Sequence, residues 1–228
     1  VKGNLALINS ITPSVIDREQ FYKDLNEKPF EEVAQKYIKV PSRRSLTRKR
    51  KLYNIARFWV YILRSSGLNI KTWCQNIYYN IFCKQVHSNI SKGCFVCFYK
   101  HSIVSIDKAA NVNVSGVLRF GYKRIKGSKL ESRLLVEKGA QLSLGEGVIY
   151  YGADLEVFPG ATLIIGDGAA FNINSTIICG DKITIGENVS FGRDVTVRDN
   201  NGGHYMSRRV YKVNRPVSIG QHSWLCEQ

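Results

Sequence analysis

The sequence predicts a mainly β protein, a parallel β-helix that follows a basic α-helical segment. Three observations lead to this prediction. Aliphatic residues recur at six-residue steps through the C-terminal half, 16 of the 19 glycines lie at or beyond Gly116, and positive charge is concentrated before residue 107. Two regions of different physical character therefore meet near residues 90–115.

The charge is distributed unevenly along the chain. Its 228 residues include 33 Lys and Arg against 18 Asp and Glu, a net charge of +15. Residues 33–106 hold 14 basic and no acidic residues, whereas residues 1–32 sum to −2 and residues 107–228 to +3. The 44% of hydrophobic residues excludes disorder of the whole chain, and a mean hydropathy of −0.18 argues against a polytopic membrane protein.

Residues 1–40 are expected to form short helices. One covers 17–25, where Asp17 is a cap-type residue, and one covers 29–39, where Pro29 suits a first turn. The stretch from Asp17 to Tyr37 faintly resembles the tail of deazaflavin-dependent hydrogenase β-subunit relatives. We interpret residues 1–40 as the remnant of a fusion, without catalytic weight.

Residues 41–90 are expected to form basic amphipathic helices. Apolar residues follow Pro41 and again follow Gly67 at helical spacing, with arginines seven positions apart beside the first series. The two series are Leu52, Ile55, Ala56, Trp59, Ile62 and Leu63, then Ile70, Trp73, Cys74, Ile77, Tyr78 and Ile81. Neither reaches the ~18 to 20 uncharged residues that a membrane-spanning helix needs.

Two interpretations of this basic segment stay open. In one, the helices lie on an anionic membrane leaflet, because basic residues stand beside tryptophans and tyrosines. In the other, the apolar stripes pack on each other or on a neighbouring subunit, and the charges face water. Nucleic acid is not expected as a partner, because no recognition motif accompanies the charge.

The cysteines next to this segment do not predict a metal site. Cys83, His87, Cys94, Cys97 and His101 are ligand types with some zinc-like spacing. Structural zinc sites, however, take four well-spaced ligands from loops, whereas residues 94–99 form an apolar strand pattern suited to cap the first coil. We therefore expect no metal, and free thiols at all six cysteines.

The second region repeats every six residues. One series runs Ile165, Phe171, Ile177 and Ile183, and a second, shifted by two residues, runs Ile185, Phe191 and Val197. Small or aliphatic residues stand two positions before these, at Ala169, Ser175, Ile183, Val189 and Val195. Such hexapeptide repeats are typical of a parallel β-helix, in which three repeats close one coil and stacked coils bury the aliphatic residues.

Residues 107–225 resemble the left-handed β-helix hexapeptide-repeat acyltransferases, especially O-acetyltransferases of capsule and surface-polysaccharide synthesis. The resemblance is strongest over residues 177–204 and in the return segment 216–225, Pro-Val-Ser-Ile-Gly-Gln-His-Ser-Trp-Leu. The chain departs from the family pattern at Asn201, where an acid is usual, at the added glycine of Gly202-Gly203, and at Cys226, where glycine is expected. The family continues for several more coils, so we expect residues 91–228 to form a left-handed β-helix that is incomplete at its C-terminal end.

The resemblance and the residue chemistry together select candidate site residues. His204 follows a glycine-rich exit from a coil, and a neutral imidazole suits a base that takes the proton of a sugar hydroxyl. Asp199 is expected to orient His204 or to hold its loop. Arg215 and Trp224 are candidates for contact with the cofactor, and Arg198 and Asn201 for contact with the sugar; for Trp224, packing on a further coil is the alternative.

The function that the resemblance implies is transfer of an acetyl group from acetyl-CoA to a sugar or glycan hydroxyl, by a homotrimer. The cytoplasm is the expected location, at the inner membrane face if the helices dock there. A non-catalytic β-helix for oligomerisation or membrane docking is the main alternative, because the missing coils hold much of the family's coenzyme A site. A carbonic anhydrase-like protein is disfavoured, since it needs three converging histidines and only His204 and His222 follow residue 101.

Overall fold

The computed structural model describes residues 23–24, 27, 47–125, 127–200 and 214–226. The chain divides into two units, Val1–Leu46 and Thr47–Gln228. In the first unit the structure describes only Lys23, Asp24 and Glu27, all helical. The two short helices expected over 17–25 and 29–39 otherwise lie outside the described residues.

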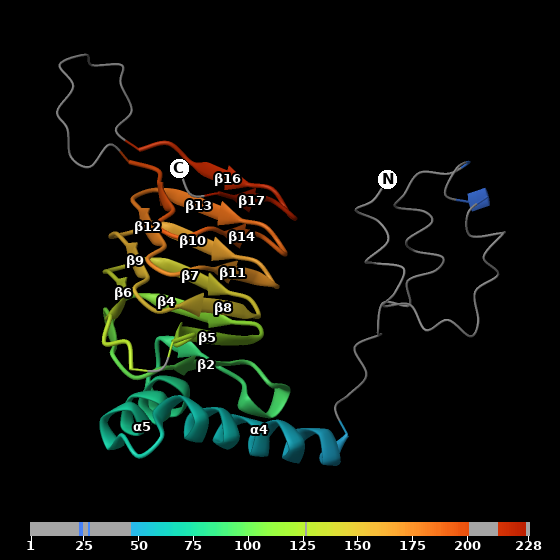
Figure 1. Ribbon diagram of the computed structural model, residues 1–228, viewed down its shortest axis with the longest axis vertical. Coiled ribbons are helices and arrows are strands. Elements are labelled where there is room, and N and C mark those ends of the chain that lie inside the picture. The colour runs from blue at the N-terminus through green and yellow to red at the C-terminus, as the bar shows by residue number, and fades with distance from the viewer. Residues whose placement is uncertain (1–22, 25–26, 28–46, 126, 201–213, 227–228) are drawn as a thin grey trace. The chain divides into compact units, whose positions relative to one another are not determined.

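The second unit is a parallel β-helix, which confirms that part of the prediction (Figure 1). Successive strands enter three sheets in turn, and every strand pairs in parallel with the strand three places on. Sheet 1 contains β1 (Val86–His87), β4 (Asn111–Val114), β7 (Gln141–Leu144), β10 (Thr162–Ile165), β13 (Lys182–Ile185) and β16 (Val217–Ile219). Sheet 2 contains β2 (Phe95–Phe98), β5 (Val117–Tyr122), β8 (Gly147–Tyr150), β11 (Ala169–Phe171), β14 (Ser190–Phe191) and β17 (Trp224–Leu225). Sheet 3 contains β3 (Ser102–Ile106), β6 (Ser132–Val136), β9 (Asp154–Val157), β12 (Thr176–Cys179) and β15 (Thr196–Arg198).

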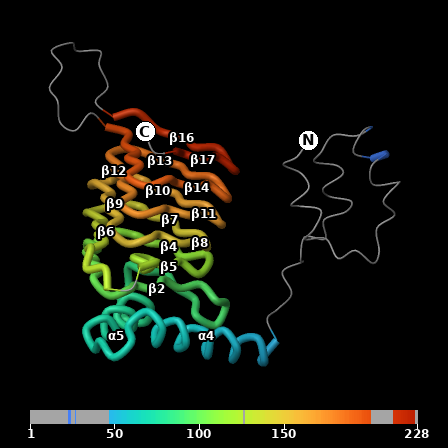
Figure 2. Tube along the Cα trace, in the orientation of Figure 1, coloured from blue at the N-terminus to red at the C-terminus, as the bar shows by residue number. Residues whose placement is uncertain are grey.

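The six-residue series points into the coil, as the repeat predicted. Both named series and the small or aliphatic residues before them are buried. Phe171 and Phe191 stack on each other between adjacent coils, with ring centroids 4.2 Å apart. Asn174 and Asn188 occupy left-handed turn positions, at φ 61° and 55°, which asparagine tolerates better than most residues. The trace in Figure 2 follows these stacked coils.

The coils are longer than three six-residue units. Leu163 pairs with Ile183 in the next coil, so the repeat there takes 20 residues. The two additional residues lie in sheet 3, where Ser175, Ile177 and Cys179 all point inward. This longer side is the physical origin of the two-residue shift between the two series.

Glycine in the repeat allows coils to approach closely at one corner. A Cβ atom on Gly166 would lie 2.7 Å from the carbonyl carbon of Gly186 in the next coil. Real Cβ atoms do not approach that closely, so the corners after β7, β10 and β13, at Gly145, Gly166 and Gly186, exclude other residues. The aliphatic-glycine-acid unit of the repeat follows from this contact.

The helices expected after Pro41 and after Gly67 are present and cover the first coil. They are α4 (Arg48–Ser66) and α5 (Ile70–Ile77), which continues into the π-helix η2 (Tyr78–Phe82); a short 3-10 helix, η3 (Ile90–Lys92), follows. Both lie at the β2 end of the stack (Figure 1). Among the described residues, no helix is long and apolar enough to cross a membrane.

The buried side of α4 is not the apolar stripe seen in the sequence. Of the expected apolar stripe only Ile62 is buried, at 1% exposure, whereas Trp59 and Leu63 are 42% and 55% exposed. The buried residues of α4 are Asn54, Phe58, Ile62, Ser65 and Ser66. Apart from Ile62 the stripe is exposed, and its Trp59 stacks on Trp73 of α5.

Candidate functional site

The candidate site lies at the corner where β15 ends and the chain later enters β16. The described chain leaves the coil at Asn200 and returns at Asn214, and these two residues form an isolated antiparallel bridge. The Asn214 side chain donates to the Gly180 carbonyl at 3.0 Å, and the Asn200 side chain donates to the Ile178 carbonyl at 3.2 Å. Both ends of the intervening segment 201–213 are thus fixed to the preceding coil.

Asp199 is the central residue of this corner and is 5% exposed. Its Oδ1 accepts from the Gly180 amide at 2.6 Å, and its Oδ2 accepts from the Asp181 amide at 2.7 Å. Its backbone carbonyl accepts from the Arg215 amide at 2.8 Å. The Asp199 carboxylate thus holds the turn after β12, and the Asp199 carbonyl holds the residue at which the chain returns. Asp199 connects this turn to both ends of the segment.

The Asp199 carboxylate also influences a neighbouring thiol. The Cys179 Sγ lies 3.7 Å from Asp199 Oδ2. Burial, together with the charge of Asp199, raises the pKa of the Cys179 thiol to about 12. This thiol is therefore protonated at neutral pH and is not a nucleophile.

The predicted site residues are distributed over two sides of the coil. Arg198, Asp199 and Arg215 meet at the corner, and Arg198 and Arg215 are exposed there. Trp224 lies elsewhere, on the outer face of sheet 2, where it is 75% exposed and pairs with Ser190. His204 and Asn201 lie outside the described residues.

Trp224 borders a groove of about 470 Å³ on the face of sheet 2. Its lining also includes His222, Ser190, Asn172, Tyr150 and Arg124. An aromatic ring, hydroxyl and amide groups and one arginine suit a ligand with both apolar and anionic parts.

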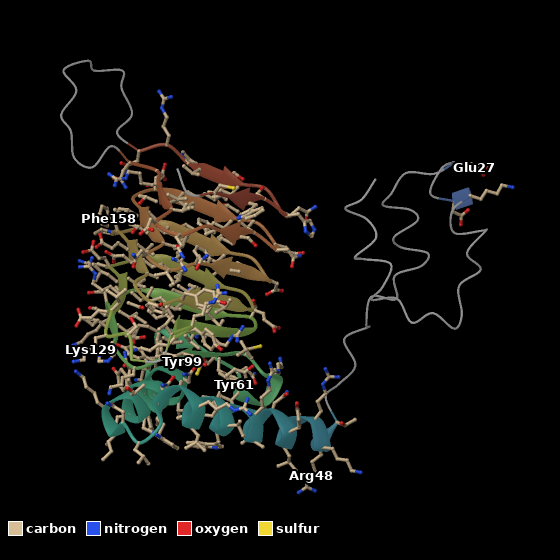
Figure 3. All side chains as sticks on the ribbon, viewed as in Figure 1. Glu27, Arg48, Tyr61, Tyr99, Lys129 and Phe158 are labelled. Atoms are coloured by element: carbon tan, nitrogen blue, oxygen red, sulfur yellow. The ribbon has the colours of Figure 1, made fainter. Side chains whose placement is uncertain are left out.

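A second hollow, of about 730 Å³, escaped the sequence analysis. It lies between the end of α4, the turn 99–101 after β2, strand β5, and residues 127–129. Its lining includes Tyr61, Tyr99 and Tyr122 and the cationic side chains of Arg64, Lys100, Arg119, Lys123 and Lys129 (Figure 3). The available signal was the interruption of the six-residue repeat between Tyr122 and Ser132, a stretch rich in lysine and arginine.

The cysteine and histidine residues with zinc-like spacing do not converge on one point. Cys83 belongs to the core inside the coil, whereas Cys97 packs on the other side of β2, beneath α4. Within residues 47–125, 127–200 and 214–226, no three His, Cys, Asp or Glu side chains form a group able to hold a metal ion.

Comparisons with known protein families, with characterised proteins and with solved structures found no match.

Proposed function

We propose that the chain is an acetyl-CoA-dependent O-acetyltransferase of capsule or surface-polysaccharide synthesis, built on a left-handed β-helix. The observation that carries the proposal is the anchored corner. A hexapeptide-repeat coil releases the chain at Asn200 and recovers it at Asn214, with Asp199 fixing both ends. The intervening segment contains His204, the residue best suited to act as a base.

In the proposed reaction, His204 takes the proton of a sugar hydroxyl while the hydroxyl oxygen attacks the thioester carbonyl of acetyl-CoA. The carbon–sulfur bond breaks, the acetyl group passes to the sugar, and the coenzyme A thiolate takes the proton that His204 holds, which restores the neutral imidazole. No covalent enzyme intermediate is needed, because positioning of two bound substrates supplies much of the rate enhancement. Asp199 is a positioning residue in this scheme, since its carboxylate is bound to backbone amides.

The remaining candidate residues have supporting roles in this proposal. Arg215 and Trp224 contact coenzyme A, and Arg198 and Asn201 contact the sugar. Arg215 and Trp224 lie on different sides of one coil. One coenzyme A molecule would therefore contact Arg215 of one copy of the chain and Trp224 of an adjacent copy. A homotrimer in the cytoplasm meets this requirement, and sedimentation velocity of the full chain tests it.

The test is acetyl transfer from radiolabelled acetyl-CoA to a panel of sugars by the full chain and by His204→Ala. Loss of a general base lowers the rate by about 10² to 10⁴-fold. His87→Ala is the matched control, because His87 is exposed on β1 at the opposite end of the stack. Equal rates for His204→Ala and the parent chain would assign the base elsewhere.

A second candidate function is a non-catalytic module for oligomerisation or docking. It is favoured by the exposed apolar side chains of the capping helices, which acyl transfer does not require. No turnover by the parent chain, with assembly or docking retained, would select this function.

A further inference from the structure

Helix α5 and the π-helix η2, which cap the first coil, turn polar side chains toward its strands. Asn76 of α5 bonds both backbone groups of Phe98, donating to its carbonyl and accepting from its amide, each at 2.8 Å. Asn80 of η2 does the same for Val96, at 2.7 and 2.9 Å. Among the described residues no strand neighbours the outer edge of β2, so these side chains replace the hydrogen bonds that a strand would make.

A second pair of contacts covers the next strand in the same way. Gln75 donates to the Ser102 carbonyl at 3.1 Å, and the Tyr79 hydroxyl donates to the Val104 carbonyl at 2.8 Å. The need to pair the strand edge thus fixes which side of α5 and η2 faces inward. Apolar side chains on the same helices are consequently placed on the other side.

The outward side of the helices is strongly apolar. We call it the docking face, and it includes Trp59, Leu63, Leu68, Ile70, Tyr78 and Phe82, between 42% and 99% exposed. Trp59 of α4 stacks on Trp73 of α5, with ring centroids 6.4 Å apart, so the two helices lie side by side. Monomeric proteins rarely expose an apolar surface spread over neighbouring helices unless it binds something.

The charges of these helices identify what it binds. Residues 48–82 carry seven basic side chains and no acidic one. We propose that the docking face lies on an anionic phospholipid bilayer, with its apolar side chains at the headgroup boundary. A second copy of the chain would bring two like-charged helix pairs together, whereas an anionic leaflet offsets the charge.

The cationic hollow beside the end of α4 is suited to a lipid phosphate. Arg64 is in α4, three residues before Gly67, and lines the hollow together with Arg119 and Lys123. Burial, and then the charge of Lys100, lowers the pKa of the Lys123 ammonium, and burial with Lys123 and Lys100 lowers the pKa of the His101 imidazole. Glu131 is the acidic side chain that opposes this effect at His101. A phosphate would relieve the mutual repulsion of these cations.

The test is co-sedimentation of the full chain with phosphatidylcholine vesicles that contain or lack phosphatidylglycerol. We expect binding to the anionic vesicles and little to the neutral ones. Raising the salt from about 0.1 to 1 M shortens the Debye length from about 10 to 3 Å and should release much of the bound chain. This docking is independent of acyl transfer, so failure of one proposal leaves the other standing.

Matched variants locate the contact. Leu63→Glu combined with Val60→Glu places two carboxylates on the docking face and is expected to weaken vesicle binding about tenfold or more. Ile103→Glu alters an equally exposed side chain on β3 and should leave binding unchanged. Circular dichroism of each variant checks that it is folded.

Three outcomes would overturn the proposal. They are failure of the parent chain to bind anionic vesicles, equal binding by the double variant, and sedimentation showing a lipid-free dimer that the double variant abolishes. The last result would assign the docking face to a second copy of the chain.

Discussion

Individual asparagines determine how the β-helix begins. Asn76 is fully buried and Asn80 nearly so, and each exchanges two hydrogen bonds with the backbone of β2. A buried amide group matches one peptide unit, because it offers one acceptor and a donor side by side. Helical propensity gives no hint of this role, since asparagine is a mediocre helix former.

Asn76→Ala is therefore expected to destabilise the chain by about 2 to 4 kcal/mol, because it leaves the amide and the carbonyl of Phe98 buried without partners. Urea denaturation followed by circular dichroism measures the loss. Asn113→Ala is the control, since Asn113 is exposed on β4 and should change stability by less than about 0.5 kcal/mol. A similar small change for Asn76→Ala would mean that water satisfies the strand edge.

Asp199 shows how much of the candidate site could be predicted from the sequence. Its place five residues before His204 indicated a supporting role, either orienting the ring or holding the loop. Its carboxylate is bound to the amides of Gly180 and Asp181, which lie almost a full coil earlier in the chain. Contacts between successive coils depend on the coil length, and the coil takes 20 residues where three units of six were expected.

At the scale of elements, periodicity located the helices but not their orientation. The 3.6-residue spacing of apolar side chains identified α4 and α5 from the sequence. On α5 and η2, polar side chains face the first coil because backbone groups of β2 and β3 require polar partners, whereas on α4 the apolar Phe58 and Ile62 face inward. Sequence alone does not show which strand edges a helix must cover.

Substitutions on the two sides of α4 should differ sharply in their effect on stability. Phe58 is 1% exposed and packs edge-on against Phe95 at 5.1 Å, so Phe58→Ala should cost about 3 to 5 kcal/mol. Leu63 is 55% exposed, and Leu63→Gln should change the free energy of unfolding by less than about 0.5 kcal/mol. Thermal and urea unfolding of both variants without lipid measures the difference. A large loss for Leu63→Gln would place that side chain in a core.

At the scale of the whole molecule, the repeat was the most informative part of the sequence. A series of inward positions six residues apart predicted the coil, its core and its parallel strands, and all of the named residues are buried. Each coil supports the next through the same contacts, so an error at one position does not change the prediction. The first coil could not be predicted this way, because it has a neighbouring coil on only one side and depends on α5 and η2.

Positive charge is also distributed unevenly over the whole molecule. Basic residues without acidic partners belong to the capping helices, whereas the coils are nearly balanced. In the proposed protein, the helices hold the chain at an anionic leaflet and the corner at Asp199 supports acyl transfer. The two activities thus use opposite ends of one stack.

The most direct measurement of the central claim is an isothermal titration of the full chain with acetyl-CoA. The acetyltransferase proposal predicts saturable heat, and competition by free coenzyme A, because free coenzyme A differs from acetyl-CoA only by the acetyl group. Substrate constants of enzymes fall between about 1 μM and 1 mM, so binding should be complete within that range. Absence of heat at about 1 mM acetyl-CoA would contradict the proposed function.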